Sequence, residues 1–308
     1  MKRAAMLMGV LAVAALVAAG QQPATQQQPS TGGKGATQQG SAAPAPLQGK
    51  RPPQAKTQPE FDAYNAAIAN QKDPAAMEKA ADDFAAKFPD SELRVLLYKA
   101  AMRAYQNANN GDKMAAMAQK LLKLDPDDPE ALIGSAEVMA ERTRSTDLDK
   151  DQRFDQATKS AQHALETIDT DVAIPAGTPQ AQIDAYKGLL RSTAYSVLGT
   201  IQYDQEKYAE AEGYFRKSID VYPTQPDPVV VLRLALALDK QGKYPDALKE
   251  ANRAVELTQE GTTAGTTARH ERDRLMQLTG NVIPGSSSPA PASQPPAPAT
   301  PNGTQPPH

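Results

Sequence analysis

Apolar and small residues recur at helical spacing through the middle of the chain. Between Ser192 and Pro223, Leu198, Ala211 and Phe215 stand among polar residues at intervals that keep them on helix faces. An interval of three or four residues places side chains on one side of an α-helix. The following segment repeats the pattern with Leu234, Ala247 and Ala251. The pattern predicts successive amphipathic helices, each burying one face against its neighbours.

Turn signals divide these helices into pairs. Tyr208 and Tyr244 each open a second helix, in the sequences EKYAEA and GKYPDA. Residues 123–132, KLDPDDPEAL, have the composition of a turn between two units, with Asp at candidate N-cap positions. Farther upstream, Asp73 and Pro74 supply an N-cap and a first-turn proline. The chain is therefore expected to repeat one helix–turn–helix unit.

This unit resembles the tetratricopeptide repeat, which has 34 residues. With a unit starting at Ser192, Gln202 departs from the Tyr that the family has at position 11, and Tyr203 stands beside it. Six other family positions are matched: Tyr195, Leu198, Gly199, Ala211, Phe215 and Pro223. The resemblance implies that small residues let the two helices of a unit approach closely, while stacking of units supplies the shared core.

The frame predicts an all-α, right-handed solenoid of five units that is closed by a capping helix at Thr267–Thr279, with Gly280 as its stop. The third unit has an enlarged turn at residues 142–151, and a long helix, with Thr178 as N-cap, runs from Pro179 to about Gln205. A plain helical bundle is the alternative fold. The five predicted units are 61–94, 95–128, 129–171, 192–225 and 228–261.

The two ends of the chain differ from the repeats. Residues 1–20 have Lys2 and Arg3 before an uncharged apolar run, which is typical of a signal peptide; an uncleaved membrane anchor is the alternative. Residues 21–58 contain ten Gln and no acid, and predict a disordered linker before a solenoid at 59–280. Residues 281–308 are rich in Pro, Ser and Ala and predict a disordered tail.

Composition excludes several kinds of site. The chain has no Cys, which excludes disulfides, thiolate chemistry and a lipid-modified cysteine, and it has three His. Its net charge is −3, and taking away the two cations of residues 1–20 and the four of residues 21–58 leaves −9 for the rest. An acidic solenoid lacks the basic surface that a nucleic acid needs. We expect no cofactor, no metal and no nucleic-acid partner.

One acidic segment has part of the spacing of a calcium loop. Asp147, Asp149, Asp151 and Asp155 stand at loop positions 1, 3, 5 and 9, but the Gly at position 6 and the Glu at position 12 are missing. We interpret the segment as a solvated turn in which Asp151 caps the next helix. Asp125, Asp127 and Asp128 are interpreted as residues of the inter-repeat turn that favour the following helix N-terminus.

In the family that the chain resembles, first-helix side chains line a concave groove for peptides or partner helices. Lys99 and Arg103, four residues apart on one helix, are candidates to hold a carboxylate, although Glu137 and Glu141 do not fit the family's paired Lys and Asn clamp. Ordinary solvated positions are the alternative interpretation of the whole set. The groove candidates are Asn65, Lys99, Arg103, Glu137, Glu141, Ser196, Thr200, Tyr203 and Arg233.

These features predict a non-catalytic scaffold of the bacterial cell envelope, exported, periplasmic or secreted, that binds proteins or peptides. Residues 84–92, FAAKFPDSE, resemble repeats of outer-membrane assembly proteins, so an assembly factor of the outer membrane or of a secretion system is an alternative. An enzyme that uses Glu137 or Glu141 is a third hypothesis, which the lack of an interpretable acid–base pair disfavours.

Overall fold

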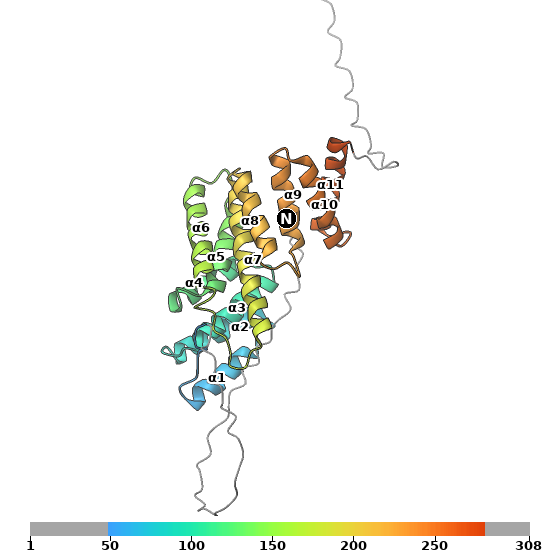
Figure 1. The fold of residues 1–308 in the computed structure, drawn as a ribbon. Helices are drawn as coiled ribbons and strands as arrows, with labels where there is room; N and C mark the ends of the chain where they lie inside the picture. The colour runs from blue at the N-terminus through green and yellow to red at the C-terminus, as the bar shows by residue number, and fades with distance from the viewer. Residues whose placement is uncertain (1–48, 281–308) are drawn as a thin grey trace, which may run out of the picture.

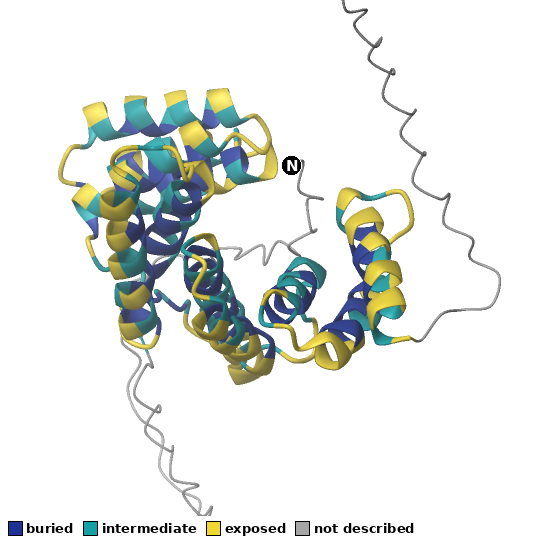
Figure 2. Ribbon diagram, turned by 90° about the horizontal axis from the view of Figure 1, so that it is seen from above, coloured by how far each residue is buried: buried dark blue, intermediate teal, exposed yellow. Residues whose placement is uncertain are grey.

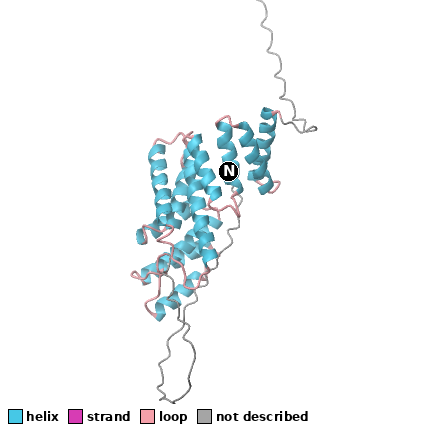
Figure 3. Cartoon of the chain, in the orientation of Figure 1, coloured by secondary structure: helices cyan, strands magenta, loops and turns pink. Residues whose placement is uncertain are grey.

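The structure is a computed structural model, and it describes residues 49–280. These residues form eleven α-helices joined by short turns, and their one β-type pairing is an isolated parallel bridge between Lys50 and Ala173 (Figures 1 and 3). The helices are α1 Gln58–Ile68, α2 Pro74–Lys87, α3 Arg94–Asn107, α4 Gly111–Leu124, α5 Pro129–Arg142, α6 Lys150–Thr167, α7 Gln180–Asp204, α8 Tyr208–Asp220, α9 Pro228–Lys240, α10 Tyr244–Leu257 and α11 Thr263–Thr279.

Successive helices pack as five pairs, α1 with α2 through α9 with α10, and α11 packs on α10. These pairs correspond to the five predicted units, and α11 to the predicted capping helix. The all-α solenoid expected from the sequence is therefore confirmed. The long predicted helix is also present as α7, and Gly188 does not interrupt it.

The helices follow an open curve when the molecule is seen from above (Figure 2). The first helices of neighbouring units touch one another, as α5 does with α7 and α7 with α9. Second helices of neighbouring units make no comparable contact within the described residues. The spacing between units is shortest on the inside of a curve, so the first helices line the inner face of the solenoid.

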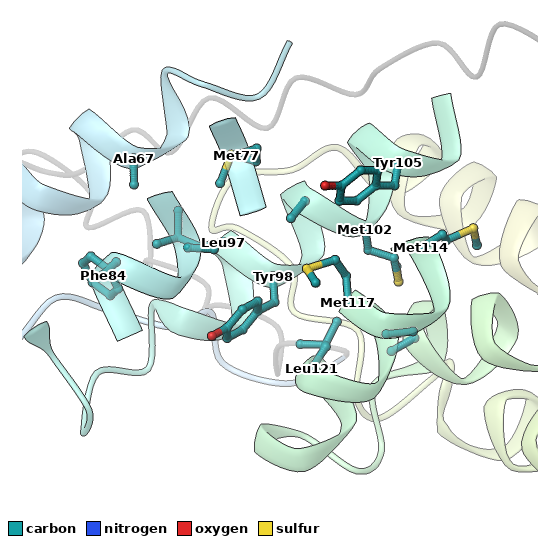
Figure 4. Packing of buried hydrophobic residues seen from close by; sticks show 14 of the residues in the cluster. Ala67, Met77, Phe84, Leu97, Tyr98, Met102, Tyr105, Met114, Met117 and Leu121 are labelled. Atoms are coloured by element: carbon teal, nitrogen blue, oxygen red, sulfur yellow. The ribbon is translucent and has the colours of Figure 1, made fainter. Parts of the chain in front are cut away.

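The core changes in character along the chain. Around α2, α3 and α4 it contains fully buried Met77, Leu97 and Met117 with Tyr98 and Phe84 (Figure 4). Around α8 to α11 it consists of Val, Leu and Ala packed on Phe215, which is also fully buried. A Cβ on Gly199 would lie 2.6 Å from the Phe215 ring, so the closest approach of α7 to α8 requires glycine.

Several predicted helix ends are confirmed, and three differ. Asp73 caps α2 and Asp128 caps α5 with their carboxylates, and Gly280 ends α11 in the left-handed conformation. Pro179, not Thr178, is the N-cap of α7, because the Thr178 hydroxyl donates to the Pro175 carbonyl.

The prediction that Asp151 caps a helix was wrong. Helix α6 begins at Lys150, inside the predicted turn 142–151, so Asp151 lies in its first turn and Asp149 is the N-cap. The enlarged turn therefore covers residues 143–149. Helix α11 likewise begins at Thr263, ahead of the predicted Thr267, because the Thr262 hydroxyl accepts from the Gly265 amide.

Residues 49–57, the last part of the predicted linker, lie against the repeats. Lys50 bonds to the α6–α7 loop and Arg51 to the α2–α3 turn, so contact with the solenoid begins before residue 59. The predicted signal peptide, the linker as far as residue 48 and the tail 281–308 lie outside the described residues. Across residues 49–280, no helix combines the length and apolar character needed to cross a bilayer.

Candidate functional site: the inner face of the first helices

All nine residues predicted to line a groove belong to first helices. Asn65 lies on α1, Lys99 and Arg103 on α3, Glu137 and Glu141 on α5, and Arg233 on α9. The remaining three, Ser196, Thr200 and Tyr203, lie on α7. Their helices line the inner face, but the contacts divide them into groups. The largest groups lie between α3 and α5 and between α7 and α9.

The α3 cations are neutralised by two carboxylates at the N-terminus of α5. Lys99 Nζ lies 2.5 Å from the Asp128 carboxylate and 3.4 Å from that of Glu130. Arg103 donates through two guanidinium nitrogens to Glu130 Oε1, at 3.0 and 2.6 Å. Arg103 also donates to the Tyr186 hydroxyl at 3.2 Å. One network thus joins α3, α5 and α7.

Electrostatics hold this network in its charged form. Burial opposes ionisation of Glu130, but Arg103 and Lys99 overcome it and lower its pKa to about 2. Burial and the neighbouring Glu130 raise the pKa of the Tyr186 hydroxyl above its ordinary value. The Lys99 ammonium is likewise stabilised by Asp128 and Glu130, which raise its pKa despite burial. At neutral pH the network offers neither a general base nor an uncompensated cation.

Two partners in this network escaped the sequence analysis. Glu130 is the second residue of the third unit and lies on the same first helix as Glu137. The repeat frame that selected Glu137 as a groove candidate could therefore have selected Glu130 too. Tyr186 lies before the start of the fourth unit, on the extra N-terminal turns of α7. The repeat pattern begins at residue 192 and so says nothing about the preceding turns of α7. The contact of Tyr186 with Arg103 is visible only in the tertiary structure.

A second group lies where α7 meets α9. Arg233 Nη1 donates to Thr200 Oγ1 at 2.6 Å. Burial raises the pKa of Asp204, at the end of α7, and the charge of Arg233 opposes that rise. Burial also raises the pKa of Tyr203, whose ring meets Tyr208 edge to face at 5.3 Å. Hydroxyl, carboxylate, guanidinium and aromatic groups therefore share this part of the inner face.

The capping helix extends this group. Arg274 of α11 lies 2.5 Å from Asp239 of α9 and 3.0 Å from Glu271 on its own helix. Asp239 and Glu271 are close enough to Tyr203 to contribute to its raised pKa. First-helix side chains of α7 and α9 and side chains of α11 thus form one polar surface with an aromatic ring in it.

The enlarged turn forms a shallow cavity of about 540 Å³ lined by Glu141, Arg142, Arg144, Asp147 and Arg153. Two acids of this turn are engaged with the chain's own groups. Asp147 accepts from the Arg144 amide at 2.9 Å, and Asp149 from Arg153 at 2.8 Å. No cluster of residues with the makeup of a metal site is present within residues 49–280.

The acids of the α4–α5 turn do more than favour the next helix. Asp128 is both the N-cap of α5 and a partner of Lys99. Asp127 lies 2.7 Å from the Nε2 atom of His163, and this hydrogen bond raises the pKa of the imidazole. Asp125 accepts from Lys50 at 2.6 Å. Their interpretation as helix-favouring turn residues therefore accounts for only part of their contacts.

Comparison with known proteins gives one family match. Residues 191–222 match the model of the tetratricopeptide repeat. No curated protein matches the chain. Proteins with this repeat are in general non-catalytic scaffolds for contacts between proteins.

Solved structures with a similar course of the chain include PilF of Pseudomonas aeruginosa, at 16% identity over 74% of this chain and 96% of that one, with a TM-score of 0.47. The TPR protein TTC0263 of Thermus thermophilus is 12% identical over 69% and 98% of the two chains, with a TM-score of 0.46. YrrB, described as a TPR protein with an unusual peptide-binding site, is 15% identical over 65% and 86%, at 0.42.

All three TM-scores lie below 0.5, so the assignment rests on the family match and on the helix pairs. The match covers the C-terminal part of α7, from residue 191, and all of α8. Residues 191–222 are therefore a tetratricopeptide repeat, and residues 49–280 stack five helix pairs along one curve, as a solenoid of such repeats does.

Proposed function

We propose that the chain is a non-catalytic scaffold that binds a peptide or partner helix on the inner face of its C-terminal units. The observation that carries this proposal is the polar and aromatic surface shared by α7, α9 and α11. Tyr203 is half-buried there, and the charges of Asp204, Asp239 and Glu271 are close enough to raise its pKa. An amphipathic ring beside hydrogen-bonding groups is a common anchor for a bound segment.

The α3–α5 part of the inner face is less suited to the same role. Lys99 and Arg103 are engaged by Asp128 and Glu130, and a carboxylate ligand would have to displace both acids. Such displacement would leave buried charges without partners, which is costly. The proposed binding surface therefore excludes the network around Glu130.

Site-specific photocrosslinking tests the proposal. A photoreactive phenylalanine analogue is placed at Tyr203, on the inner face, or at Tyr244, which is 38% exposed at the start of the second helix α10. The full chain is expressed with each analogue in bacterial cells and irradiated. We expect a discrete adduct from position 203 and none from position 244. Equal adducts from both positions, or none from 203, would contradict the proposal.

A second test uses the residues of α3. Charge reversal by Lys99→Glu with Arg103→Glu disrupts the network with Glu130 but leaves the surface around Tyr203 unchanged. Capture of the crosslinked partner by the folded double variant is expected to stay as in the wild type. Loss of capture would move the binding surface to α3 and α5.

We also propose that the protein acts in the cell envelope after export, on the basis of the basic and then apolar pattern of residues 1–20. Cell fractionation tests this: the chain is expected in the periplasmic fraction or the medium. A chain that stays with the outer membrane after a high-salt wash would favour the assembly-factor alternative.

A further inference from the structure

Residues 49–57, here called the strap, follow one edge of the solenoid. The strap is an extended segment with the sequence GKRPPQAKT. Lys50 meets the α6–α7 loop and the α4–α5 turn, while Arg51 and Lys56 meet the α2–α3 turn. Nine consecutive residues thus touch three successive inter-repeat turns, although repeats of a solenoid ordinarily contact only their neighbours.

The acceptors along this edge form what we call the turn track: the Asp90 carbonyl, the carboxylates of Glu92, Asp125 and Asp171, and the Val172 carbonyl. Arg51 donates to both carboxylate oxygens of Glu92, at 2.9 and 2.8 Å. A second donor, the backbone N–H of Gln54, reaches the same carboxylate at 3.3 Å.

The third unit holds the other end of the strap. Lys50 Nζ lies 2.6 Å from Asp125 and 3.7 Å from Asp171. The Asp125 side chain is only 10% exposed, which distinguishes this pair from an ordinary surface ion pair. Burial opposes the charge on Lys50, but Asp125 outweighs it and raises the pKa of the ammonium.

Backbone features fit the strap to the track. Gly49 has φ of 140°, and a Cβ on it would lie 2.5 Å from the Val172 carbonyl oxygen. The next residue, Lys50, donates its amide to that same oxygen at 3.2 Å. Pro52 and Pro53 favour an extended chain and lower the entropy lost on docking. Ala55 then packs against the core cluster of the first units.

We propose that the turn track is a peptide-recognition site for extended basic segments of the Lys-Arg-Pro-Pro type, and that the chain occupies it with its own strap. The site is on the edge formed by the inter-repeat turns, apart from the inner face, and the proposal does not rest on the proposed function. The ligand class follows from the track itself, which presents carboxylates from three successive turns and one carbonyl for backbone pairing.

Unlike the pair of Lys50 with Asp125, the pair of Arg51 with Glu92 is exposed, at 58% and 41% of the two side chains. Such pairs contribute little each. Covalent attachment compensates, since a tethered segment acts at an effective concentration in the millimolar range. A free peptide of the same sequence should therefore bind when the strap is released and compete poorly when it is docked.

The test uses the full chain and a fluorescent synthetic peptide of residues 46–58. The variant Lys50→Glu with Arg51→Glu repels its own strap from the track but touches no core residue. We expect the peptide to bind this variant at least ten times more tightly than the wild type, by fluorescence anisotropy at low salt. A peptide with Glu in place of Lys50 and Arg51 should not bind.

The matched control is Lys79→Glu with Lys159→Glu, which makes the same change in net charge at two exposed pairs away from the track. It should bind the peptide as weakly as the wild type. Gly49→Ala, which leaves the charge unchanged, should lie between the wild type and the strap variant. Circular dichroism confirms that each variant is helical.

Three outcomes would overturn the proposal. Two of them are equal binding of the peptide to the wild type and the strap variant, and binding to neither up to millimolar concentration. The third is tight binding to the Lys79 and Lys159 variant, which would show that net charge alone attracts the peptide. Conversely, Glu92→Lys with Asp125→Lys should bind the charge-reversed peptide in preference to the original one, which would support recognition by the track.

Discussion

The two ends of the solenoid are held together in different ways. In the C-terminal region, residues 192–280, polar contacts join neighbouring units, as Gln241 at the end of α9 does with Glu212 of α8 and Arg274 of the capping helix α11 with Asp239 of α9. In the N-terminal region, residues 49–191, Lys50 and Arg103 make contacts that skip whole units. The C-terminal region is thus held by contacts between neighbouring units. The N-terminal region also has contacts between units that are not neighbours.

The cores differ in the same sense. The C-terminal core is built from Leu, Val and Ala around Phe215, with glycine at the close approach of Gly199. The N-terminal core uses Met77, Met102 and Met117 with Tyr and Phe (Figure 4). Met is flexible and fills irregular spaces. The comparison teaches that the region with weaker repeat character gains long-range contacts that the regular region does without.

The largest expected effect is on the C-terminal region. Phe215→Ala removes a fully buried ring and should lower the free energy of unfolding by about 3–5 kcal/mol. Because contacts there join neighbours, α8 to α11 should unfold before the N-terminal region does. Urea unfolding followed by circular dichroism and by hydrogen exchange measures both effects. A single unfolding transition in which all eleven helices of residues 49–280 unfold together would contradict this difference between the two regions.

The next effect concerns the network across α3, α5 and α7. Glu130→Gln removes the shared carboxylate of Lys99 and Arg103 and should lower the free energy of unfolding by about 3 kcal/mol. Urea unfolding measures it. The control is Glu166→Gln on α6, which removes an acid whose side chain is 75% exposed. An equal loss in both variants would argue against a special role for the network.

The same substitution has a pH signature. The pKa of Glu130 is about 2 in the folded chain, below its ordinary value of 4.5. A carboxyl group with a lowered pKa stabilises the fold above the unfolded pKa, and this contribution is lost as the pH falls. The difference in unfolding free energy between wild type and Glu130→Gln should therefore be full above pH 4.5 and shrink toward pH 2. A difference that stays constant over this range would contradict the ion-pair account.

A smaller pH effect tests the tie between α6 and the α4–α5 turn. Asp127 raises the pKa of His163 above 6.5, so this pair stabilises the fold fully below pH 6.5 and loses its effect as the pH rises through the raised value. Because the His163 side chain is 42% exposed, His163→Gln should cost less than about 1 kcal/mol at about pH 5.5. The cost should fall further at about pH 8.5, by urea unfolding; a larger cost at the higher pH would reverse the expected sign.

The sequence predicted the helices and their stacking well because both depend on local spacing. Leu198, Gly199, Ala211 and Phe215 carry the family pattern, and the structure uses them for close packing of α7 on α8. Helix ends were predicted where one side chain decides them, as with Asp73 and Gly280. The prediction that Asp151 caps a helix was wrong because the enlarged turn is shorter than its polar composition indicates.

The candidate site was predicted less completely because its contacts are tertiary. Repeat spacing placed Lys99 and Arg103 on one helix face, but it could not reveal that Glu130 and Tyr186 engage them. Composition likewise assigned residues 49–57 to a linker. Their cations reach acids that lie 41 and 75 positions away in sequence, and no local pattern records such partners.

Hydrogen exchange on the full chain tests the account's central claim that the strap ties the first three units together. The measurement compares wild type with the double variant Lys50→Glu and Arg51→Glu. Amide exchange should become faster at the α2–α3 and α4–α5 turns and at the α6–α7 loop together, while α9 to α11 stay unchanged. Faster exchange confined to residues 49–57, or spread evenly over all eleven helices, would contradict the claim.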